Sequence, residues 1–473
     1  MKQIAIALFL VFIAASTATS QWAKLVGPDG RAEDYYGSAV AISGNTLVVG
    51  APGDDFPPLP LNIGGAYVYV TDGTQWTMQQ FLLGTGIDSN SGFGSSVAID
   101  GNVIVVGAPT DSINGNRRGS AFVIERSGTS WFETAQLVSL DGIQILGERF
   151  GHSVAVSGDT IVVGAPLKDE AGRENQGAAY VFTRTGSAWI FQTKLLASDG
   201  AEGDQFGRSV AISGDNIIVG AIFDDPKGSA YIFARSGSSW AEKVKLTPSD
   251  TDFDFGDSVA ISGGTAVVGA PSTIGSAYVF TNNGSTWPQT AKLTSGTPTP
   301  LTFFGASVSV SSGLIVVGAD ISGVSGAAYL FRRLGGRWIS DGQLAAFDIS
   351  PGANYGFAVA VSRGNAVVGA RLDDIQTRVD QGSAFTSTGI PYRVLLSGRV
   401  LGPYGRGVSN AVLSLSNNQT GDKHFAVTNP FGYYHFADIP ANDFTLSIAS
   451  KRFTYSPRVL SLRDDLANVD ITP

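Results

Sequence analysis

The chain has 473 residues, of which 43% are apolar and 15% charged, with 60 glycines and no cysteine. High glycine and low charge suit a turn-rich β-protein, and the lack of cysteine excludes disulfides, zinc–thiolate sites and thiol catalysis. The formal net charge of −9 argues against a general nucleic-acid-binding protein, which needs a basic face.

Residues 1–20 are predicted to be a secretory signal peptide. Lys2 gives a positive start, an apolar run extends from Ile4 to Ala15, and Ala18-Thr19-Ser20 offers a small-residue cleavage site. The run is shorter than the roughly 20 residues that a membrane helix needs, and no later segment is long enough to span a bilayer. We expect a protein that is secreted, periplasmic or on the cell surface, and export without disulfides favours a bacterial source. A retained anchor is the alternative.

Short apolar runs separated by turn residues follow. Between Phe150 and Leu195 the runs read SVAV, TIVVGA, AAYVF and WIFQTKL. β-Branched and aromatic runs separated by Gly, Ser and Asp are typical of antiparallel strands, and the tight turn at Ser157-Gly158-Asp159 is a hairpin signal. The runs are apolar on both faces, as in sheets covered on both sides. This unit is predicted to be a four-stranded meander.

The unit recurs seven times. Each copy opens with an aromatic residue and glycine, at Tyr36-Gly37, Phe93-Gly94, Phe150-Gly151, Phe206-Gly207, Phe255-Gly256, Phe304-Gly305 and Tyr355-Gly356. A VGA element follows in each copy, with its glycine at Gly50, Gly107, Gly164, Gly220, Gly269, Gly318 and Gly369. A period near fifty residues with four strands per unit predicts the blades of a β-propeller.

The fourth strand indicates how the ring closes. It opens with tryptophan in six copies, at Trp76, Trp131, Trp189, Trp240, Trp287 and Trp338, and no tryptophan follows Phe385. The missing copy is Trp22-Ala23-Lys24-Leu25, before the first repeat. We therefore predict an all-β, seven-bladed propeller over residues 21–388, closed by pairing of Trp22–Val26 with Ser383–Ser387, which leaves no unpaired inner edge.

At these residues the chain resembles the FG-GAP repeat family, which includes the propeller of integrin α-subunits. The resemblance covers about residues 22–388 and implies a propeller that binds protein ligands. The calcium-binding blades of that family carry an acidic D-x-D-x-D-G loop between the FG and GAP strands, whereas this chain has tight turns such as Ser213-Gly214-Asp215. Such a turn has too few oxygens for the 6–8 ligands of calcium. No cofactor or metal is expected.

After a linker at 389–393 the pattern changes. Alternating strands are predicted at Val408–Leu415, His424–Thr428, Tyr433–Phe436 and Thr445–Ala449, which indicates a small β-sandwich over 394–473. The elements Gly432-Tyr433-Tyr434-x-Phe436 and Ile439-Pro440-Ala441 resemble the carboxypeptidase regulatory-like domain. That family is a transthyretin-like sandwich without catalytic residues, so an accessory module is implied.

Catalytic motifs are missing. The three histidines are His152, His424 and His435. In the other blades the position of His152 is occupied by Ser38, Ser95, Arg208, Asp257, Ala306 and Phe357. No G-x-S-x-G elbow, H-E-x-x-H motif or phosphate-binding loop stands in a suitable context. We predict no catalytic residues and no enzymatic activity. A hydrolase or lyase remains the least favoured alternative, and it would require His, Arg and carboxylates to converge at the channel mouth.

Acidic residues concentrate in the loops of one rim, because the loop after a blade's second strand and the loop to the next blade emerge on the same face. The candidate binding residues are pairs of acids that stand at the same distance after the VGA element in three blades: Asp54 and Asp55, Asp224 and Asp225, and Asp373 and Asp374. The second member of each pair is the stronger candidate. These acids either solvate and cap loops or form a negative surface for a cation, a basic partner or a polar glycan.

The leading functional hypothesis is an exported, non-catalytic binding or adhesion protein that presents propeller loops to an extracellular protein or surface ligand. The alternative is a carbohydrate-binding or scaffold component of an extracellular assembly. Its sites would show exposed aromatics, and the loops offer few, namely Phe56, Phe223 and Phe253. Neither nucleic acid nor a membrane span is expected.

Overall fold

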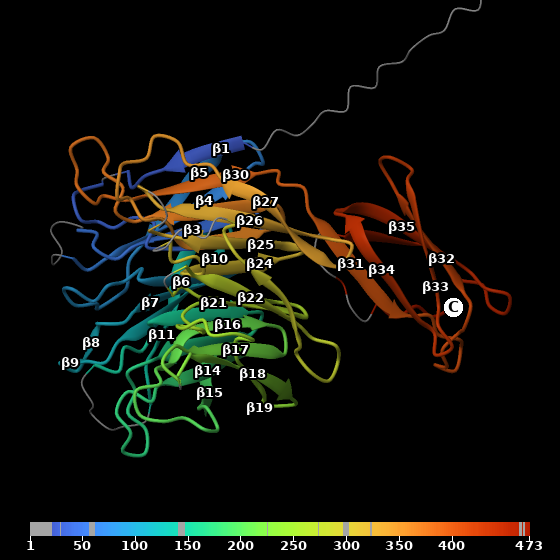
Figure 1. Cartoon of the computed structure of the whole chain (residues 1–473), viewed down its shortest axis with the longest axis horizontal. Helices are drawn as coiled ribbons and strands as arrows, with labels where there is room; N and C mark the ends of the chain where they lie inside the picture. Colours follow the sequence, from blue (N-terminus) through green and yellow to red (C-terminus); the bar gives the residue numbers. More distant parts are fainter. Residues whose placement is uncertain are drawn as a thin grey trace, which may run out of the picture.

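A computed structural model describes residues 21–28, 30–55, 62–140, 147–224, 226–272, 274–296, 302–321, 324–462, 466 and 469–473. The predicted signal peptide lies outside these residues. The named secondary-structure elements are all strands, and the described part of the chain contains no helix with the length and hydropathy of a membrane span. Figure 1 shows a large propeller and, on one side of it, a small C-terminal domain.

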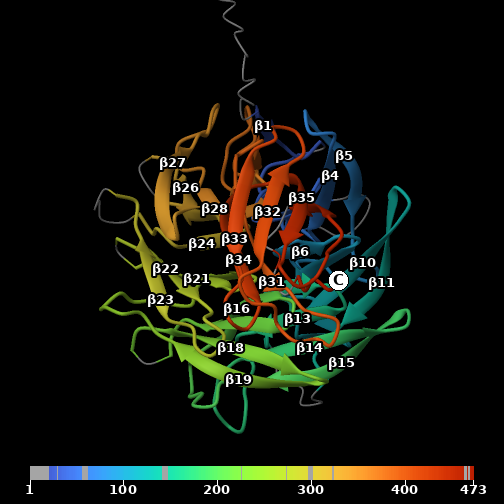
Figure 2. The ribbon, with the colours of Figure 1, turned by 90° about the vertical axis from the view of Figure 1, so that its right-hand side faces the viewer.

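Seven four-stranded sheets radiate around one axis (Figure 2). Blade 1 contains β2 (Ala39–Ser43), β3 (Thr46–Ala51), β4 (Gly65–Thr71) and β5 (Trp76–Leu82). Blade 2 contains β6 (Ser96–Asp100), β7 (Val103–Ala108), β10 (Ser120–Ser127) and β11 (Ser130–Leu137). Blade 3 contains β12 (Ser153–Ser157), β13 (Thr160–Ala165), β14 (Ala178–Thr185) and β15 (Ala188–Leu195). A small hairpin of β8 (Ser112–Ile113) and β9 (Asn116–Arg117) lies in the loop between β7 and β10.

Blades 4 to 6 repeat the order. Blade 4 contains β16 (Phe206–Ser213), β17 (Asn216–Ala221), β18 (Ser229–Ser236) and β19 (Ser239–Leu246). Blade 5 contains β20 (Val259–Ser262), β21 (Thr265–Ala270), β22 (Ser276–Thr281) and β23 (Gln289–Leu293). Blade 6 contains β24 (Ser307–Ser311), β25 (Leu314–Ala319), β26 (Ala327–Leu334) and β27 (Arg337–Leu344). The first strand of each blade lines the axis and the fourth is outermost, as the predicted meander requires.

Blade 7 combines both ends of the propeller. Its strands β28 (Tyr355–Ser362), β29 (Asn365–Ala370) and β30 (Ser383–Thr388) are completed by β1 (Gln21–Leu25) in the order β1-β30-β29-β28. Trp22 lies opposite Ser387 and Lys24 opposite Phe385 in an antiparallel register. The predicted closure by the N-terminal strand is confirmed, and so is the count of seven blades.

The recurring glycines fix the contact between neighbouring blades. A Cβ on Gly164 would stand 2.1 Å from the carbonyl oxygen of Gly207, the glycine that opens the next blade. The same approach occurs at all seven boundaries, and at the closure a Cβ on Gly369 would meet the Gly37 oxygen at 1.9 Å. Only glycine permits this approach of two backbones. The VGA and aromatic–glycine elements are therefore two halves of one contact.

The aromatic residue beside each opening glycine fills the space between blades. Phe206 is fully buried, and its ring meets Tyr231 on the third strand edge-on with centroids 5.5 Å apart. Phe150 and Phe255 make the same contact with Tyr180 and Tyr278. Edge-to-face pairs of this kind add about 0.5–1.5 kcal/mol beyond their buried area, so the aromatics serve mainly as packing.

The C-terminal domain is a β-sandwich. One sheet pairs β31 (Arg393–Arg399) with β34 (Tyr433–Pro440), and the other has the order β33 (Lys423–Val427), β32 (Val412–Asn417), β35 (Asn442–Ala449), β36 (Arg458–Leu462). Its core includes Leu413, Leu415, Phe436 and Phe444. The strand predicted from Val408 begins at Val412, because residues 400–410 form a loop. A hydrogen bond from the Val408 amide to the Val400 carbonyl holds this loop.

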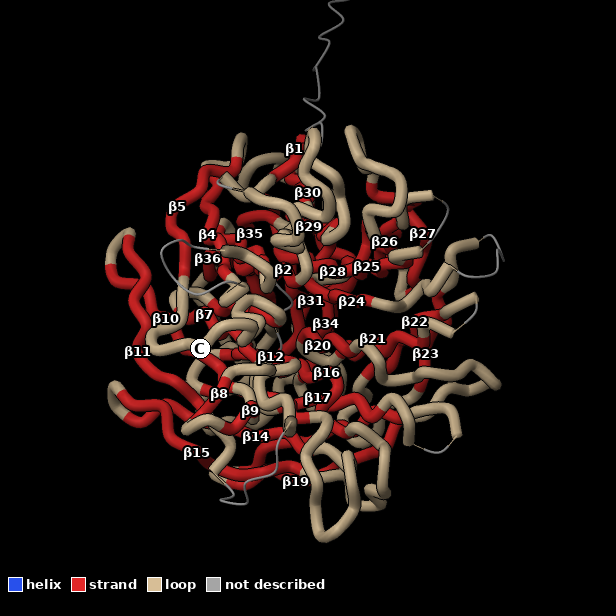
Figure 3. The backbone as a smooth tube through the Cα atoms, turned by 90° about the vertical axis from the view of Figure 1, so that its left-hand side faces the viewer, coloured by secondary structure: helices blue, strands red, loops and turns tan. Residues whose placement is uncertain are grey.

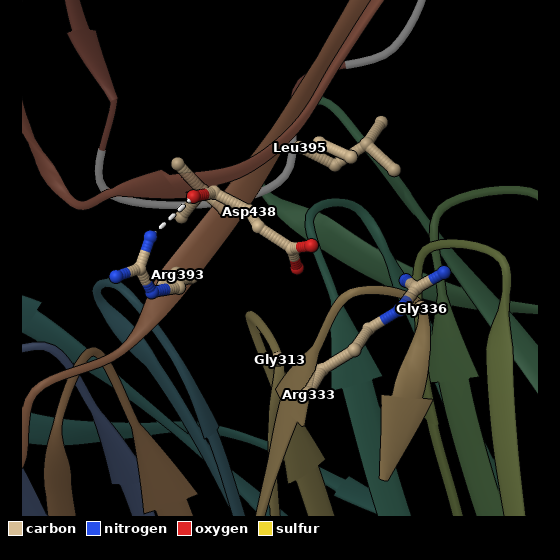
Figure 4. Close-up of a pocket in the computed structure, with 8 residues that line it drawn as sticks. Gly313, Arg333, Gly336, Arg393, Leu395 and Asp438 are labelled. Atoms are coloured by element: carbon tan, nitrogen blue, oxygen red, sulfur yellow. Dashed lines mark hydrogen bonds between the residues drawn. The ribbon is translucent and has the colours of Figure 1, made fainter.

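The sandwich contacts the rim of tight turns on blades 6 and 7. The Gly335 amide, in the turn between β26 and β27, donates a hydrogen bond of 2.7 Å to the Asp438 carboxylate. Arg393 donates one of 2.6 Å to the Asp438 carbonyl, drawn as a dashed line in Figure 4. Ile390, inside the predicted linker, is buried in the propeller core and its amide bonds the Gly364 carbonyl at 2.8 Å. The connection is thus packed on the propeller.

This packing predicts how the chain tolerates truncation. A chain ending at Tyr392 keeps Ile390 and should fold as a closed propeller. A chain ending at Thr388 should also fold but lose about 1.5–3 kcal/mol of unfolding free energy, the contribution of one buried isoleucine. Urea unfolding of both chains measures the difference. Insoluble or protease-sensitive product from the longer chain would mean that the sandwich supports the propeller.

Candidate functional site

The two rims of the propeller differ in length and chemistry. The rim that faces the sandwich consists of short turns, such as the one at Gly158 and the one at Gly186. The opposite rim, which faces the viewer in Figure 3, carries the longer loops between second and third strands and the connections between blades. The β8–β9 hairpin belongs to this loop rim. It is the adaptable face of the ring.

The first acid of each predicted pair is buried at the base of a loop. Asp54, Asp224 and Asp373 expose 2%, 5% and 0% of their surface. Asp54 accepts a hydrogen bond of 2.5 Å from the Tyr67 hydroxyl, and Asp373 accepts one of 2.6 Å from the Ser383 hydroxyl. Asp224 accepts one from the Tyr231 hydroxyl. These carboxylates hold the loops to their blades, and their part in binding stays a prediction.

The second acids lie nearer the surface. Asp374 is exposed and accepts a 2.9 Å bond from the Asp380 amide, and half-buried Asp55 accepts a 2.6 Å bond from the Asn62 amide. Asp225 lies outside the described residues. Asp55 and Asp374 therefore close their own loops while part of each carboxylate still faces solvent.

Lysines of the outermost strands pair with many acids of the loop rim, which we did not predict. Lys245 lies 2.7 Å from Asp224 and 2.6 Å from Asp199, and Lys292 lies 2.6 Å from Asp250. Lys24 lies 2.9 Å from Asp373. The sequence signal for these ion pairs is the lysine that precedes the last leucine of an outermost strand, as in Trp22-Ala23-Lys24-Leu25. The rim is consequently less negative than its acid count suggests.

The pKa values follow from these pairs. Burial opposes ionisation of Asp199, but hydrogen bonds from Lys245 and Tyr231 lower its pKa overall. Asp250 behaves in the same way, with Lys292 and Tyr278 outweighing burial to lower its pKa. Both acids are charged at neutral pH, and each shares its lysine with a second aspartate, Asp224 in the first case and Asp252 in the second.

Large apolar side chains stand exposed on the loop rim of blades 4 to 7. Seven of them expose between 44% and 74% of their surface: Phe223, Phe253, Ile274, Ile321, Val324, Phe347 and Val379. Each lies in a loop after a second strand or between blades. Phe223 and Phe253 are among the predicted loop aromatics, while Phe56 lies outside the described residues. Scattered exposed apolar residues are ordinary, but a concentration on one rim is typical of an interaction surface.

The channel mouth on this rim gathers titratable residues from neighbouring blades. The residue after each opening glycine lies at the start of an innermost strand, and in blades 3 to 5 these are His152, Arg208 and Asp257. The Arg208 guanidinium donates a 3.0 Å bond to the Asp257 carboxylate. Burial lowers the pKa of His152 to about 4, and the charges of Arg208 and Arg149 add to this. His152 is therefore neutral at neutral pH.

Blades 6 and 7 complete this mouth. The Arg371 guanidinium lies 3.7 Å from the centre of the Phe357 ring. Burial raises the pKa of Asp320, and the charge of Arg371 opposes that rise. The residue at the slot of His152 varies between blades. The structure makes the varied residues neighbours, and their common offset after the glycine was the signal for this.

The channel continues beneath the mouth. Its cavity of about 240 Å³ is lined by the first strands of all seven blades, through valine, isoleucine and alanine side chains with Ser309 as the polar exception.

In the described part of the chain, no three His, Cys, Asp or Glu side chains gather closely enough to hold a metal ion. The FG–GAP connections are tight turns, with Gly44, Gly158 and Gly214 at φ of 54–57°. These turns offer few oxygens to a cation.

Calcium removal should therefore leave the propeller intact. We expect a chelator to change the Tm by less than about 2 °C, a shift smaller than the loss of about 1 kcal/mol would cause. Differential scanning calorimetry with and without chelator makes the measurement, and calcium-saturated chelator is the control. A drop of ten degrees would reveal a calcium site in the loops.

Known proteins match both parts of the chain. The FG-GAP repeat model matches residues 19–69, 76–124, 131–182, 189–233, 240–280, 287–331 and 338–386, and the carboxypeptidase regulatory-like domain model matches residues 396–472. Integrin alpha-7 of Mus musculus is 30% identical over 180 residues, which are 34% of this chain and 14% of that protein. Integrin alpha-7 of Homo sapiens is 32% identical over 170 residues, 33% of this chain and 13% of that protein.

The matched segment is thus a small part of these relatives. Among solved structures, the crystal structure of the RRP9 WD40 repeats covers 78% of this chain and 99% of its own, with a TM-score of 0.50 and 11% identity. That likeness concerns the propeller fold alone.

Proposed function

Because the chain belongs to the FG-GAP repeat family, we propose that it is an exported, non-catalytic binding or adhesion protein whose propeller presents its loop rim to an extracellular protein ligand. The supporting observation is the concentration of seven exposed apolar side chains on the loop rim of blades 4 to 7. Interfaces combine an apolar centre with a polar rim, and exposed acids such as Asp374 and Glu202 lie in the same set of loops.

The opposite rim suits this role less well. Its turns are short, and the sandwich occupies part of it through Asp438 and Arg393. A ligand of ordinary interface size needs about 800 Å² on each partner, which the open loop rim offers more readily. The propeller is thus oriented, with the loop rim free and the turn rim joined to the accessory domain.

Catalysis is not part of the proposal. At the channel mouth Arg208 and Asp257 are already paired with each other at 3.0 Å, and no hydroxyl of the described residues forms a hydrogen bond with the His152 side chain. A catalytic site needs a nucleophile or base aimed at open space. The mouth instead supplies fixed charges and the Phe357 ring, which suit recognition of a polar group.

The acids of the loop rim should tune binding through long-range charge. Asp55→Asn, Asp225→Asn and Asp374→Asn together remove three charges, while each asparagine keeps an oxygen that can accept the loop bonds seen at Asp55 and Asp374. We expect nearly unchanged folding and about three- to tenfold weaker capture of proteins from the producing organism's medium at low salt. The difference should shrink at physiological salt, because ions screen exposed charges.

The matched control is Asp72→Asn, Asp159→Asn and Asp215→Asn, which removes three charges from the turn rim. Capture should be unaffected in this control. Equal capture by the loop variant and the wild type at both salt concentrations would leave the loop acids as turn formers only. Glycosidase or protease treatment of the medium distinguishes a protein ligand from the carbohydrate alternative.

A further inference from the structure

The end of the sandwich farthest from the propeller carries a pocket of about 430 Å³. β31 leaves the propeller at Arg393 and runs to Arg399, so the loop that follows lies about 20 Å from the contact at Asp438. Figure 2 views the molecule from this side. Two loops, 402–410 and 450–453, line the pocket, and neither includes a strand residue.

Three cations surround this pocket without a carboxylate among its lining residues. Arg406, Lys451 and Arg452 are exposed. None of them forms an ion pair with any described residue of the chain. The sandwich has seven basic and six acidic residues from 394 to 473, in a chain whose net charge is −9. The positive charge is thus local, and no carboxylate of the described residues pairs with it.

Rings and neutral polar groups complete the lining. Tyr404 is 94% exposed, whereas Phe453 is half-buried and its ring lies so close to Gly402 that a Cβ there would stand 3.2 Å away. Phe453 therefore forms a floor, and Tyr404 stands at the edge of the pocket with its ring in solvent. Ser409, Asn410 and Ser450 add hydroxyl and amide groups.

We propose that this pocket binds an acidic sugar unit of a polysaccharide, one whose ring carries a carboxylate or a sulfate. Arginine recognises such anions through paired N–H donors, Ser409 and Asn410 can bond ring hydroxyls, and Tyr404 offers an aromatic face to the ring. The volume lies within the 300–1,000 Å³ range of small-ligand sites. An extended acidic peptide would seek a strand edge, and the lining provides only loops.

The test uses the full chain and immobilised polygalacturonate, with neutral dextran and polyglutamate as comparison surfaces. Arg406→Gln with Arg452→Gln should reduce the affinity for polygalacturonate at least about tenfold, and Tyr404→Ala should reduce it about threefold. Tyr404 is so exposed that its removal leaves the fold unchanged. The control variant, Lys423→Gln with Arg337→Gln, removes the same two charges from exposed positions elsewhere and should bind within about twofold of wild type.

Three results would overturn the proposal. The first is that the wild type binds polygalacturonate no more strongly than dextran. The second is that the pocket and control variants lose affinity for polygalacturonate equally, and the third is that polyglutamate is bound as strongly as polygalacturonate. Either of the last two results would mean that the binding is a non-specific attraction between opposite charges. The site is independent of the loop rim, so the triple aspartate variant should bind polygalacturonate as wild type does.

Discussion

Replacing Gly164 by alanine is expected to destabilise the propeller by about 3 kcal/mol or more, at the upper end of overpacking costs. The new Cβ would stand 2.1 Å from the Gly207 carbonyl oxygen, which belongs to the backbone of the next blade. No side chain can move to relieve this contact, so two blades must separate. Urea unfolding followed by tryptophan fluorescence gives the change in free energy.

Gly264→Ala is the matched control. A Cβ at Gly264 meets nothing closer than 3.6 Å, and its backbone does not adopt the left-handed conformation. This variant should unfold within about 0.5 kcal/mol of the wild type, as most surface substitutions do. Similar stability of the two variants would contradict the view that the repeated glycines exist for contact between blades.

Replacing three exposed apolar residues of the loop rim should nearly abolish ligand capture. In Phe223→Ser, Phe253→Ser and Val324→Ser, each side chain is at least half exposed, so the stability should change little. Apolar and aromatic anchors dominate binding energy, often at 2 kcal/mol or more each, so capture should fall at least about thirtyfold. Pull-down from the culture medium, quantified by mass spectrometry, makes the measurement.

The control places the same change on the circumference of the ring. Phe132, Ile190 and Ile339 lie on outermost strands and are 56%, 49% and 47% exposed. Their replacement by serine removes similar apolar area and should leave capture within about twofold. Loss of capture in both triple variants would place the ligand on the side of the propeller.

The fold was predictable because each repeat encodes one local unit. The seven aromatic–glycine starts gave the blade count, and the displaced Trp22 predicted the closure that the pairing with Ser387 confirms. The strand predicted from Val408 was too long, since alternation continues through a loop whose backbone bonds to Val400. Periodicity alone does not show where a strand loses its partner.

The candidate site was predictable only in part. Sequence placed the acids on one rim, but it did not separate buried Asp54 from exposed Asp374, because partners such as Tyr67 and the lysines lie on other strands. The exposure of Val324 and Phe347 also depends on tertiary structure. The cluster at the channel mouth arises from blades 3 to 7, so residues such as His152 and Arg208, 56 positions apart, meet only in the closed ring.

The most direct test of the loop rim as the binding surface is capture by oriented protein. Because the chain has no cysteine, one introduced thiol couples it to a maleimide surface in a single orientation. Ser238→Cys, in the exposed turn between β18 and β19, leaves the loop rim free, and Glu202→Cys, in the exposed loop between blades 3 and 4, faces that rim toward the support.

At equal coupling density, we predict that the Ser238-linked protein captures ligand from the medium at least about tenfold better than the Glu202-linked protein, since an interface of about 800 Å² per partner must stay accessible. Equal capture in both orientations, or better capture by the Glu202-linked protein, would contradict the assignment of binding to the loop rim.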